Sequence, residues 1–229
     1  MKNKLKPIES AIDLWDIRLS DLHGELSDCM ALLADTERAR AGRLVQKKDA
    51  ERFALCRGLR RRILAGYLEQ DPAGLQFKQN GNGKPFLEDG GLEFNVSHSR
   101  DRMLIAVAAG RSVGVDIEFR RDDVPMDAIA TRWFSAQELA RFRDSETPQR
   151  LFFDIWAQKE AFVKARGKGI FHDLSSFTVP ADRRTTLPRI GKNYRWVFQP
   201  LEIDPAYAAA LVFEAPAVPV QIRSFASHE

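Results

Sequence analysis

Two acidic residues separated by one position form the first feature of the sequence with a clear chemical use. Asp116 and Glu118 lie within the run GVDIE at residues 114–118. The alternation of apolar and acidic residues predicts a strand, and a strand directs residues i and i+2 to the same face. Paired carboxylates of this kind bind Mg²⁺, a hard cation that prefers oxygen ligands. The structural alternative is a solvated polar face on a strand whose apolar residues pack inward.

A glutamate and a lysine four positions apart form the second feature. Glu160 and Lys164 lie in a segment with apolar residues at helical spacing, from Phe152 to Val163. On a helix the two side chains share one face, one turn apart. One interpretation is an exposed ion pair, worth roughly 0.3–0.5 kcal/mol. The other has Glu160 as a third metal ligand and Lys164 in contact with a phosphate oxygen.

Two further segments carry residue types that bind phosphate. The triplet SHS at residues 97–99 follows an apolar run, which places it on a predicted turn. Hydroxyl groups, an imidazole and exposed backbone amides donate hydrogen bonds to phosphate oxygens. Lys84 lies in the glycine-rich loop NGNGKP at residues 80–85. Taken singly, a histidine in a turn or a lysine in a loop is usually an ordinary solvated surface residue.

The four motifs acquire meaning from their order along the chain. They are GKP at residues 83–85, NVSHS at residues 95–99, GVDIE at residues 114–118, and WxxKExxxKxxGKG at residues 156–169. In this order they resemble the 4′-phosphopantetheinyl transferases of the Sfp type. The resemblance extends to the total length and to the lobe organisation described below.

The resemblance implies an α+β fold with two pseudosymmetric lobes. Each lobe would have helices packed on a small antiparallel sheet, with the ligand cleft between the lobes. The implied activity transfers 4′-phosphopantetheine from coenzyme A to a serine hydroxyl of an apo acyl- or peptidyl-carrier protein. The reaction would release 3′,5′-ADP and depend on Mg²⁺, with Mn²⁺ as a possible replacement. The alternative is an inactive family member that acts as a carrier-protein or nucleic-acid binding module.

The resemblance also implies roles for individual residues. The implied metal ligands are Asp116, Glu118 and Glu160, and the implied catalytic residues are Glu160, Lys164 and His98. Coenzyme A would be bound by Arg52, Lys84, Ser97, His98 and Lys164, with Arg38, Arg40 or Arg43 as further candidates. Glu160 has two competing roles, because a carboxylate bound to a metal is a poor base.

Hydrophobic periodicity predicts the elements that position these residues. Helical segments are expected over residues 27–70 and 127–166, the second with a break at residues 145–148. Strands are expected over residues 12–19, 92–96, 103–108, 112–119, 176–179, 194–198, 207–213 and 220–225. Short connections predict that the strands between residues 92 and 119 form an antiparallel meander. A boundary near Gly110 divides the chain into lobes of residues 1–110 and 111–229.

Composition restricts the remaining possibilities. The chain has 229 residues, of which 44% are hydrophobic and 29% charged, which is typical of globular proteins. Cys29 and Cys56 are too few to predict a disulfide framework. No apolar run reaches the ~20 residues of a transmembrane helix, and no secretion signal is recognisable, so a cytoplasmic protein without a membrane partner is expected. We also expect a monomer, because the two lobes would complete the site within one chain.

Charge and exposed apolar residues suggest partners. The net charge is only +3, but basic residues crowd positions 38–62, which favours an anionic ligand or an acidic carrier protein. The run RGLRRR at residues 57–62 is the basis of the nucleic-acid alternative, although it contains no recognisable nucleic-acid motif. Residues 124–129 are expected to dock an apolar surface of the carrier. The sequence does not identify which carrier or pathway is served.

Overall fold

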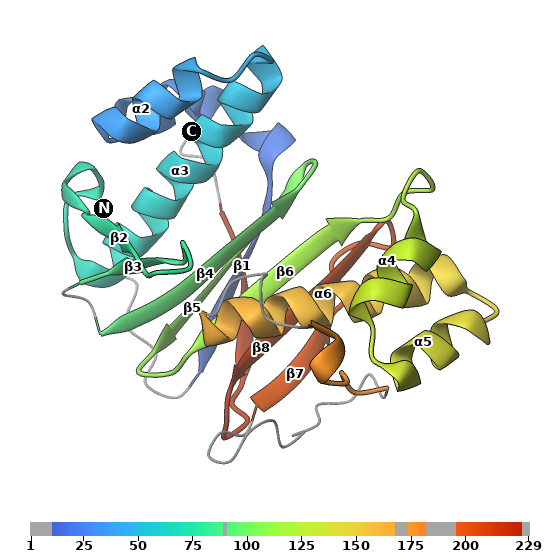
Figure 1. The fold of residues 1–229 in the computed structure, drawn as a ribbon. Coiled ribbons are helices and arrows are strands. Elements are labelled where there is room, and N and C mark those ends of the chain that lie inside the picture. Colours follow the sequence, from blue (N-terminus) through green and yellow to red (C-terminus); the bar gives the residue numbers. More distant parts are fainter. Residues whose placement is uncertain (1–10, 89–90, 168–173, 182–195, 226–229) are drawn as a thin grey trace.

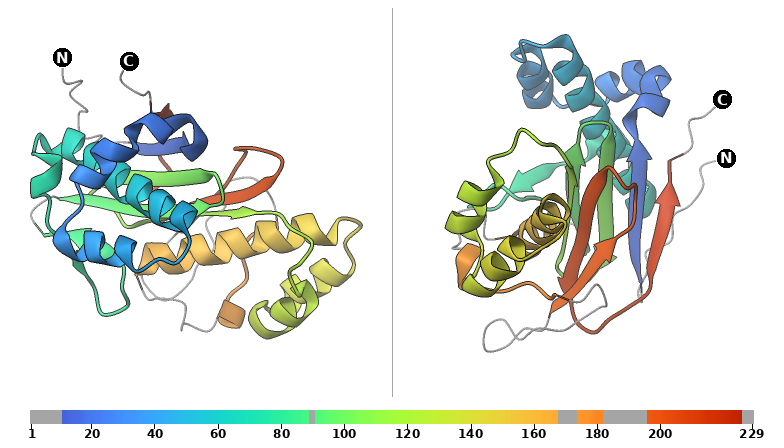
Figure 2. Two further views of the ribbon diagram at one scale, coloured as in Figure 1. Left: turned by 90° about the horizontal axis from the view of Figure 1, so that it is seen from above. Right: turned by 90° about the vertical axis from the view of Figure 1, so that its right-hand side faces the viewer.

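A computed structural model describes residues 11–88, 91–167, 174–181 and 196–225. Lys168 and Gly169 of the last motif lie outside these residues. The described chain is α+β: the helices of the first half and those of the second half lie on different sides of the strands (Figures 1 and 2). None of its helices is both long and apolar enough to cross a membrane.

The bounds of the elements agree with the predicted helical and β segments in most places. The helices are α1 (Leu26–Ala31), α2 (Asp35–Gly42), α3 (Lys47–Leu68), α4 (Met126–Trp133), α5 (Ala136–Arg143) and α6 (Pro148–Arg166). The strands are β1 (Ile12–Arg18), β2 (Phe77–Gln79), β3 (Pro85–Leu87), β4 (Leu92–Ser99), β5 (Arg102–Ala109), β6 (Val113–Phe119), β7 (Trp196–Leu201), β8 (Tyr207–Glu214) and β9 (Val220–Ser224). The predicted helical stretch at residues 27–70 is thus divided into three helices.

The first sheet has the strand order β4-β5-β1-β9. Its β4-β5-β1 part, which comes from the first half of the chain, is antiparallel as expected, and β9 from the second half adds to β1 in parallel. The β9 strand comes from the second half of the chain, where Arg223 forms an ion pair with the buried Asp13 of β1 at 2.6 Å. Local periodicity predicts that residues 220–225 form a strand but cannot name its partner.

The second sheet has the order β6-β8-β7 and is covered by α6. Gly114 on β6 permits this close contact, because a Cβ there would lie 2.1 Å from the carbonyl oxygen of Ala161. The alternate residues Val113, Val115 and Ile117 point away from α6, into an apolar layer shared with β1 and β5. The two sheets therefore pack against each other, and the acidic side chains of β6 face α6.

Three local predictions are corrected by the structure. The strands β4, β5 and β6 do not form one meander, because β6 pairs with β8 in the other sheet. Residues 97–99 lie on β4 and not on a turn. Residues 176–179 are not a strand: a 3₁₀ turn covers Leu174–Ser176, and buried side chains satisfy the backbone around it. Lys159 donates to the carbonyls of Leu174 and Phe177, which replaces the partners that a sheet would provide.

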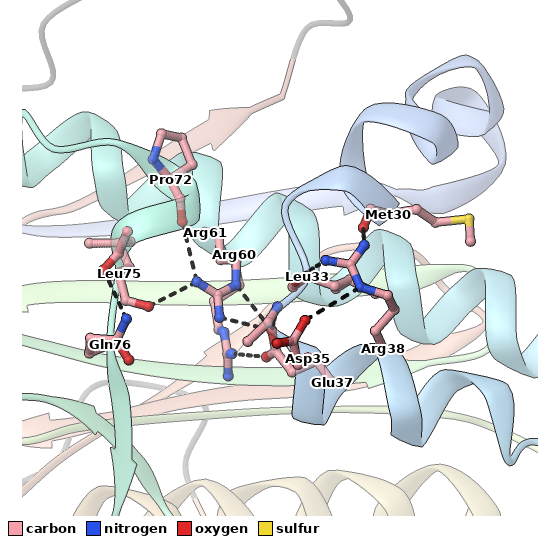
Figure 3. Close-up of polar contacts among 12 residues, drawn as sticks. Met30, Leu33, Asp35, Glu37, Arg38, Arg60, Arg61, Pro72, Leu75 and Gln76 are labelled. Carbon is pink, nitrogen blue, oxygen red and sulfur yellow. Dashed lines mark hydrogen bonds and ion pairs between the residues drawn. The ribbon is translucent and has the colours of Figure 1, made fainter.

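The helix α2 is attached to α3 by charge, since none of its side chains is buried. Glu37 accepts hydrogen bonds from Arg60 at 2.8 Å and from Arg61 at 2.9 and 3.0 Å (Figure 3). Arg61 also donates to the carbonyl of Leu75. Arg60 and Arg61 are each 3% exposed, so these arginines form a buried joint and not a row of free phosphate contacts.

Candidate active site

Three elements meet at the carboxylate of Asp116. Its Oδ1 atom accepts hydrogen bonds from Lys164 Nζ of α6 at 2.5 Å and from Ser97 Oγ of β4 at 2.9 Å. Lys164 also reaches Ser97 Oγ at 3.2 Å. Asp116 is 2% exposed, so these contacts are shielded from bulk water. The structure thus joins residues from three of the four sequence motifs.

Two buried carboxylate oxygens beside this contact have no hydrogen-bond partner. They are Oδ2 of Asp116 and Oε1 of Glu160. Buried polar atoms almost always have a partner, so orphaned anionic oxygens from a strand and a helix fit a site for a cation. In the residues that the structure describes, no three acidic, histidine or cysteine side chains are gathered closely enough to form a metal centre. The argument for a cation site therefore rests on the two unpartnered oxygens of Asp116 and Glu160.

Negative charge is concentrated around these oxygens. Burial raises the pKa of Glu118 to about 7, and repulsion from Asp116 and Glu160 adds to the effect while Lys164 opposes it. Burial also raises the pKa of Glu160, against the attraction of Lys164. Burial alone would lower the pKa of Lys164, but the three surrounding carboxylates hold it above its usual value. Lys164 therefore remains an ammonium group, the counter-charge of the acidic cluster.

His98 lies on the opposite face of β4 from Ser97, because neighbouring residues of a strand alternate. The His98 side chain is exposed to solvent, but partial desolvation by its surroundings lowers its pKa, and the positive charges of Arg52, Lys164 and Arg57 lower it further. Arg52 forms an ion pair with Asp49 at 2.7 Å and is partly exposed. The imidazole therefore lies in a positive field, which suits an anionic ligand.

The loop that carries Lys84 contacts β6 and the end of α6. The Nζ atom of Lys84 donates to the carbonyl of Val113 at 3.1 Å and lies 3.9 Å from Glu93 Oε2. The same loop donates from Asn80 and Asn82 to the carbonyl of Gly167, each at 2.9 Å. Because burial lowers its pKa, Lys84 would gain from an anionic ligand. Its predicted contact with the nucleotide stays a prediction.

Lys159 belongs to the WxxKE motif, and its role, which the sequence did not predict, is structural. It is 0% exposed and forms an ion pair with the equally buried Glu138 at 2.7 Å. Glu138 also accepts from the backbone of Ser135 and Val179, so the pair joins α5 and α6 to the segment at residues 174–179. The sequence feature that could have indicated this structural role is a lysine that interrupts an apolar helix face, one position before Glu160.

A cavity of about 750 Å³ lies beside the first turns of α6, at the end away from Lys164. Among the described residues, Arg150 and Asp154 of α6 line this cavity, together with Arg120 and residues 200–205. None of the predicted site residues is among the described residues that line it. The predicted site therefore does not coincide with this cavity.

Comparison with known proteins agrees with this geometry. Residues 20–110 match the family model described as 4′-phosphopantetheinyl transferase, N-terminal, and residues 112–212 match that of the 4′-phosphopantetheinyl transferase superfamily. The chain belongs to the 4′-phosphopantetheinyl transferase family.

Curated relatives support the same assignment over most of the chain. The 4′-phosphopantetheinyl transferase HetI of Nostoc sp. is 38% identical over 71% of both chains. The transferase psf-1 of Bacillus pumilus is 34% identical over 90% of both. The transferase Sfp of Bacillus subtilis is 29% identical over 87% of this chain and 90% of its own length. Each of these alignments covers more than two thirds of this chain and of the relative.

Proposed function

We propose that this protein transfers 4′-phosphopantetheine from coenzyme A to a serine hydroxyl of an apo acyl- or peptidyl-carrier protein. The observation that carries the proposal is the pair of buried, unpartnered oxygens on Asp116 and Glu160 beside the ammonium group of Lys164. An acidic cluster would repel the phosphates of coenzyme A unless a cation lay between them. Family membership supports the choice of reaction.

Mg²⁺, or Mn²⁺ in its place, would be held by the unpartnered oxygens of Asp116 and Glu160, and Glu118 would have to move closer to serve as the third ligand. When bound, the ion neutralises charge on the diphosphate and on the departing 3′,5′-ADP. The raised pKa of Glu118 is consistent with this role, because a carboxylate among like charges gains from a cationic ligand. Lys164 would then be free to exchange its contact with Asp116 for a phosphate oxygen.

The positive groups of the first lobe would bind the other phosphates of coenzyme A. Arg52 and His98 share one positive field, and Ser97 lies on the same strand as His98. Hydroxyl and imidazole donors fix phosphate oxygens in position, and arginine adds charge. Lys84 donates to Val113 of β6 near Gly167, the residue that ends α6, and is proposed to contact the nucleotide end of the ligand.

The chemical step would be an attack by the serine oxygen of the carrier on the phosphorus attached to pantetheine. The bond from that phosphorus to the bridging oxygen breaks, and the electron pair leaves with 3′,5′-ADP. Glu160 would accept the serine proton, directly or through a water molecule. Glu160 either binds the cation or acts as base, since one oxygen pair cannot fully serve both roles. Lys164 would stabilise charge that develops on the phosphoryl oxygens.

The carrier is proposed to approach along α4. Pro125 at its start is exposed, whereas Met126 and Ile129 are half-buried against the core of the second lobe. Only part of the predicted docking segment is therefore available for contact. The protein is proposed to act as a monomer, because residues of one chain supply the whole proposed site. Its proposed location is the cytoplasm.

Incubation with coenzyme A, Mg²⁺ and a panel of apo carrier proteins tests this function. We expect at least one carrier to gain the mass of one phosphopantetheine group in intact-protein mass spectrometry. A chelator of divalent cations should stop the gain, and added Mg²⁺ or Mn²⁺ should restore it. Unchanged masses for every acyl and peptidyl carrier would favour the alternative of an inactive binding module.

A further inference from the structure

The two halves of the proposed site lie on edge strands of different sheets. The strand β4 ends one side of the first sheet, and β6 ends one side of the second. The strand β4 carries Ser97 and His98, whereas β6 carries Asp116 and Glu118. The site can form only if these strands keep a fixed alignment, although no backbone ladder joins them.

Side chains of β4 connect the strands in place of a backbone ladder. Asn95 Oδ1 accepts from the N–H of Val115 at 2.9 Å, and Ser99 Oγ accepts from the N–H of Phe119 at 3.0 Å. Between them, Ser97 Oγ accepts from the N–H of residue 117 at 3.4 Å. The three acceptors are two residues apart on β4, and so are the three donors on β6. We call this set of three contacts the interlobe seam.

The seam satisfies backbone groups that β8 does not reach. Alternate residues of a strand direct their N–H groups to opposite sides, so β8 pairs with one set and β4 side chains accept from the other. Val115 is 0% exposed, so its N–H would be buried without a partner if Asn95 lost its oxygen. The seam is therefore required by the packing of the two sheets.

The seam also determines register. Every contact joins residues whose numbers differ by the same offset, and the next equivalent alignment requires a shift by two residues. Such a shift would move Glu118 to the place of Asp116 beside Ser97. Ser99 adds a contact with Glu118 Oε2 at 3.5 Å, parallel to the contact of Ser97 with Asp116.

We propose that Asn95 and Ser99 are positioning residues that hold the phosphate-binding strand β4 and the acidic strand β6 in one register. The inference rests on the proposed function for its effect on the reaction, but the seam itself exists in the ligand-free chain. Asn95 acts through the main chain of Val115, one position before Asp116. Ser99 acts through the main chain of Phe119, one position after Glu118.

Matched substitutions separate the acceptor from the volume of the side chain. Asn95→Leu keeps the approximate size and removes the oxygen, whereas Asn95→Asp keeps both shape and acceptor. Ser99→Ala and Ser99→Thr form the second pair and provide the milder change. Tyr67→Phe serves as a control, because it removes a buried hydrogen bond to Asp13 that lies outside the seam.

Amide hydrogen exchange of the ligand-free protein is the first measurement. We expect faster exchange at Val115 in Asn95→Leu and at Phe119 in Ser99→Ala, with protection retained in Asn95→Asp and Ser99→Thr. The Mg²⁺ concentration for half-maximal transfer should rise about tenfold in Asn95→Leu and Ser99→Ala, as expected for groups that orient ligands. Tyr67→Phe should leave both readouts unchanged.

Two results would overturn the inference. One is unchanged exchange at residues 115 and 119 in Asn95→Leu and Ser99→Ala. The other is a Mg²⁺ dependence that shifts equally in Tyr67→Phe, which would reduce the seam to a general contribution to stability. If the wild-type protein modifies no carrier, the proposed function fails, but the exchange measurement still decides whether the seam holds β6.

Discussion

Asp116 is the residue at which structure and proposed chemistry are most closely joined. One carboxylate oxygen is held by Lys164 and Ser97, and the other is buried without a partner. Its neighbour Gly114 has the opposite role, because it leaves room for the backbone of α6. A small residue and an acidic one on the same strand face together place the helix that carries Glu160 within reach.

The two cysteines give a prediction for alkaline pH. Burial raises the pKa of Cys29 to about 11 and that of Cys56 to about 12, so the thiols stay protonated when an unfolded chain has already lost its protons. Their contribution to stability is complete below about pH 8.5, the ordinary thiol pKa, and is lost as the pH rises toward 12. The unfolding midpoint in urea should therefore fall above pH 9, and less steeply in Cys56→Ala.

Thiol labelling provides the independent check on the cysteines. In the native protein at pH 8, both thiols should react far more slowly with an aromatic disulfide reagent than after unfolding, because they are buried and protonated. Native labelling at the rate of a free thiol would contradict the assigned burial of Cys29 and Cys56.

At the scale of elements, α2 is notable for its mode of attachment. Glu37 neutralises Arg60 and Arg61 together, and burial lowers the pKa of Arg60 to about 9. The positive residues of α2, among them Arg40 over the ring of Phe53, depend on this contact for their placement. One glutamate thus fixes α2, which carries Arg38 and Arg40, against α3.

Glu37→Gln tests this attachment. The change leaves two buried arginines without a carboxylate, so the free energy of unfolding should fall by about 3–5 kcal/mol. Glu51→Gln on α3 is the matched control, since its i,i+4 pair is with Lys47, whose side chain is 90% exposed, and contributes only about 0.3–0.5 kcal/mol. Urea denaturation monitored by circular dichroism measures both values. Equal losses in the two variants would contradict the buried-joint interpretation.

The sequence predicted most helices and strands correctly, and the predictions were wrong where contacts between residues distant in sequence determine the local structure. Alternation at residues 113–119 placed Asp116 and Glu118 on one face, which the contact with Lys164 and the apolar packing of Val115 confirm. The strand at residues 176–179 was wrong because Lys159 and Glu138, distant in sequence, supply its hydrogen-bond partners. Residues 97–99 were assigned to a turn because polar residues end an apolar run, whereas β4 uses them to contact β6.

At the scale of the whole molecule, the apolar faces of the two sheets pack against each other, and the proposed reactive groups lie along one edge of this interface. The shared layer contains residues from β1, β5, β6, β7 and β8, so the lobes are packed together and not merely linked. The strand β9 reinforces this arrangement by returning to the first sheet beside β1. The division into lobes at residues 1–110 and 111–229 stays a prediction, and β9 crosses it.

The most direct test of the proposed active site is to measure phosphopantetheine transfer by the variant Asp116→Ala. With a carrier that the wild-type protein modifies, coenzyme A and Mg²⁺, we expect the variant to show no mass gain on the carrier in single-turnover mass spectrometry. Its circular dichroism and thermal unfolding should remain those of a folded protein, with Asp116→Asn as a second variant that preserves side-chain volume. Near-wild-type transfer by either folded variant would contradict the assignment of Asp116, and with it the proposed site.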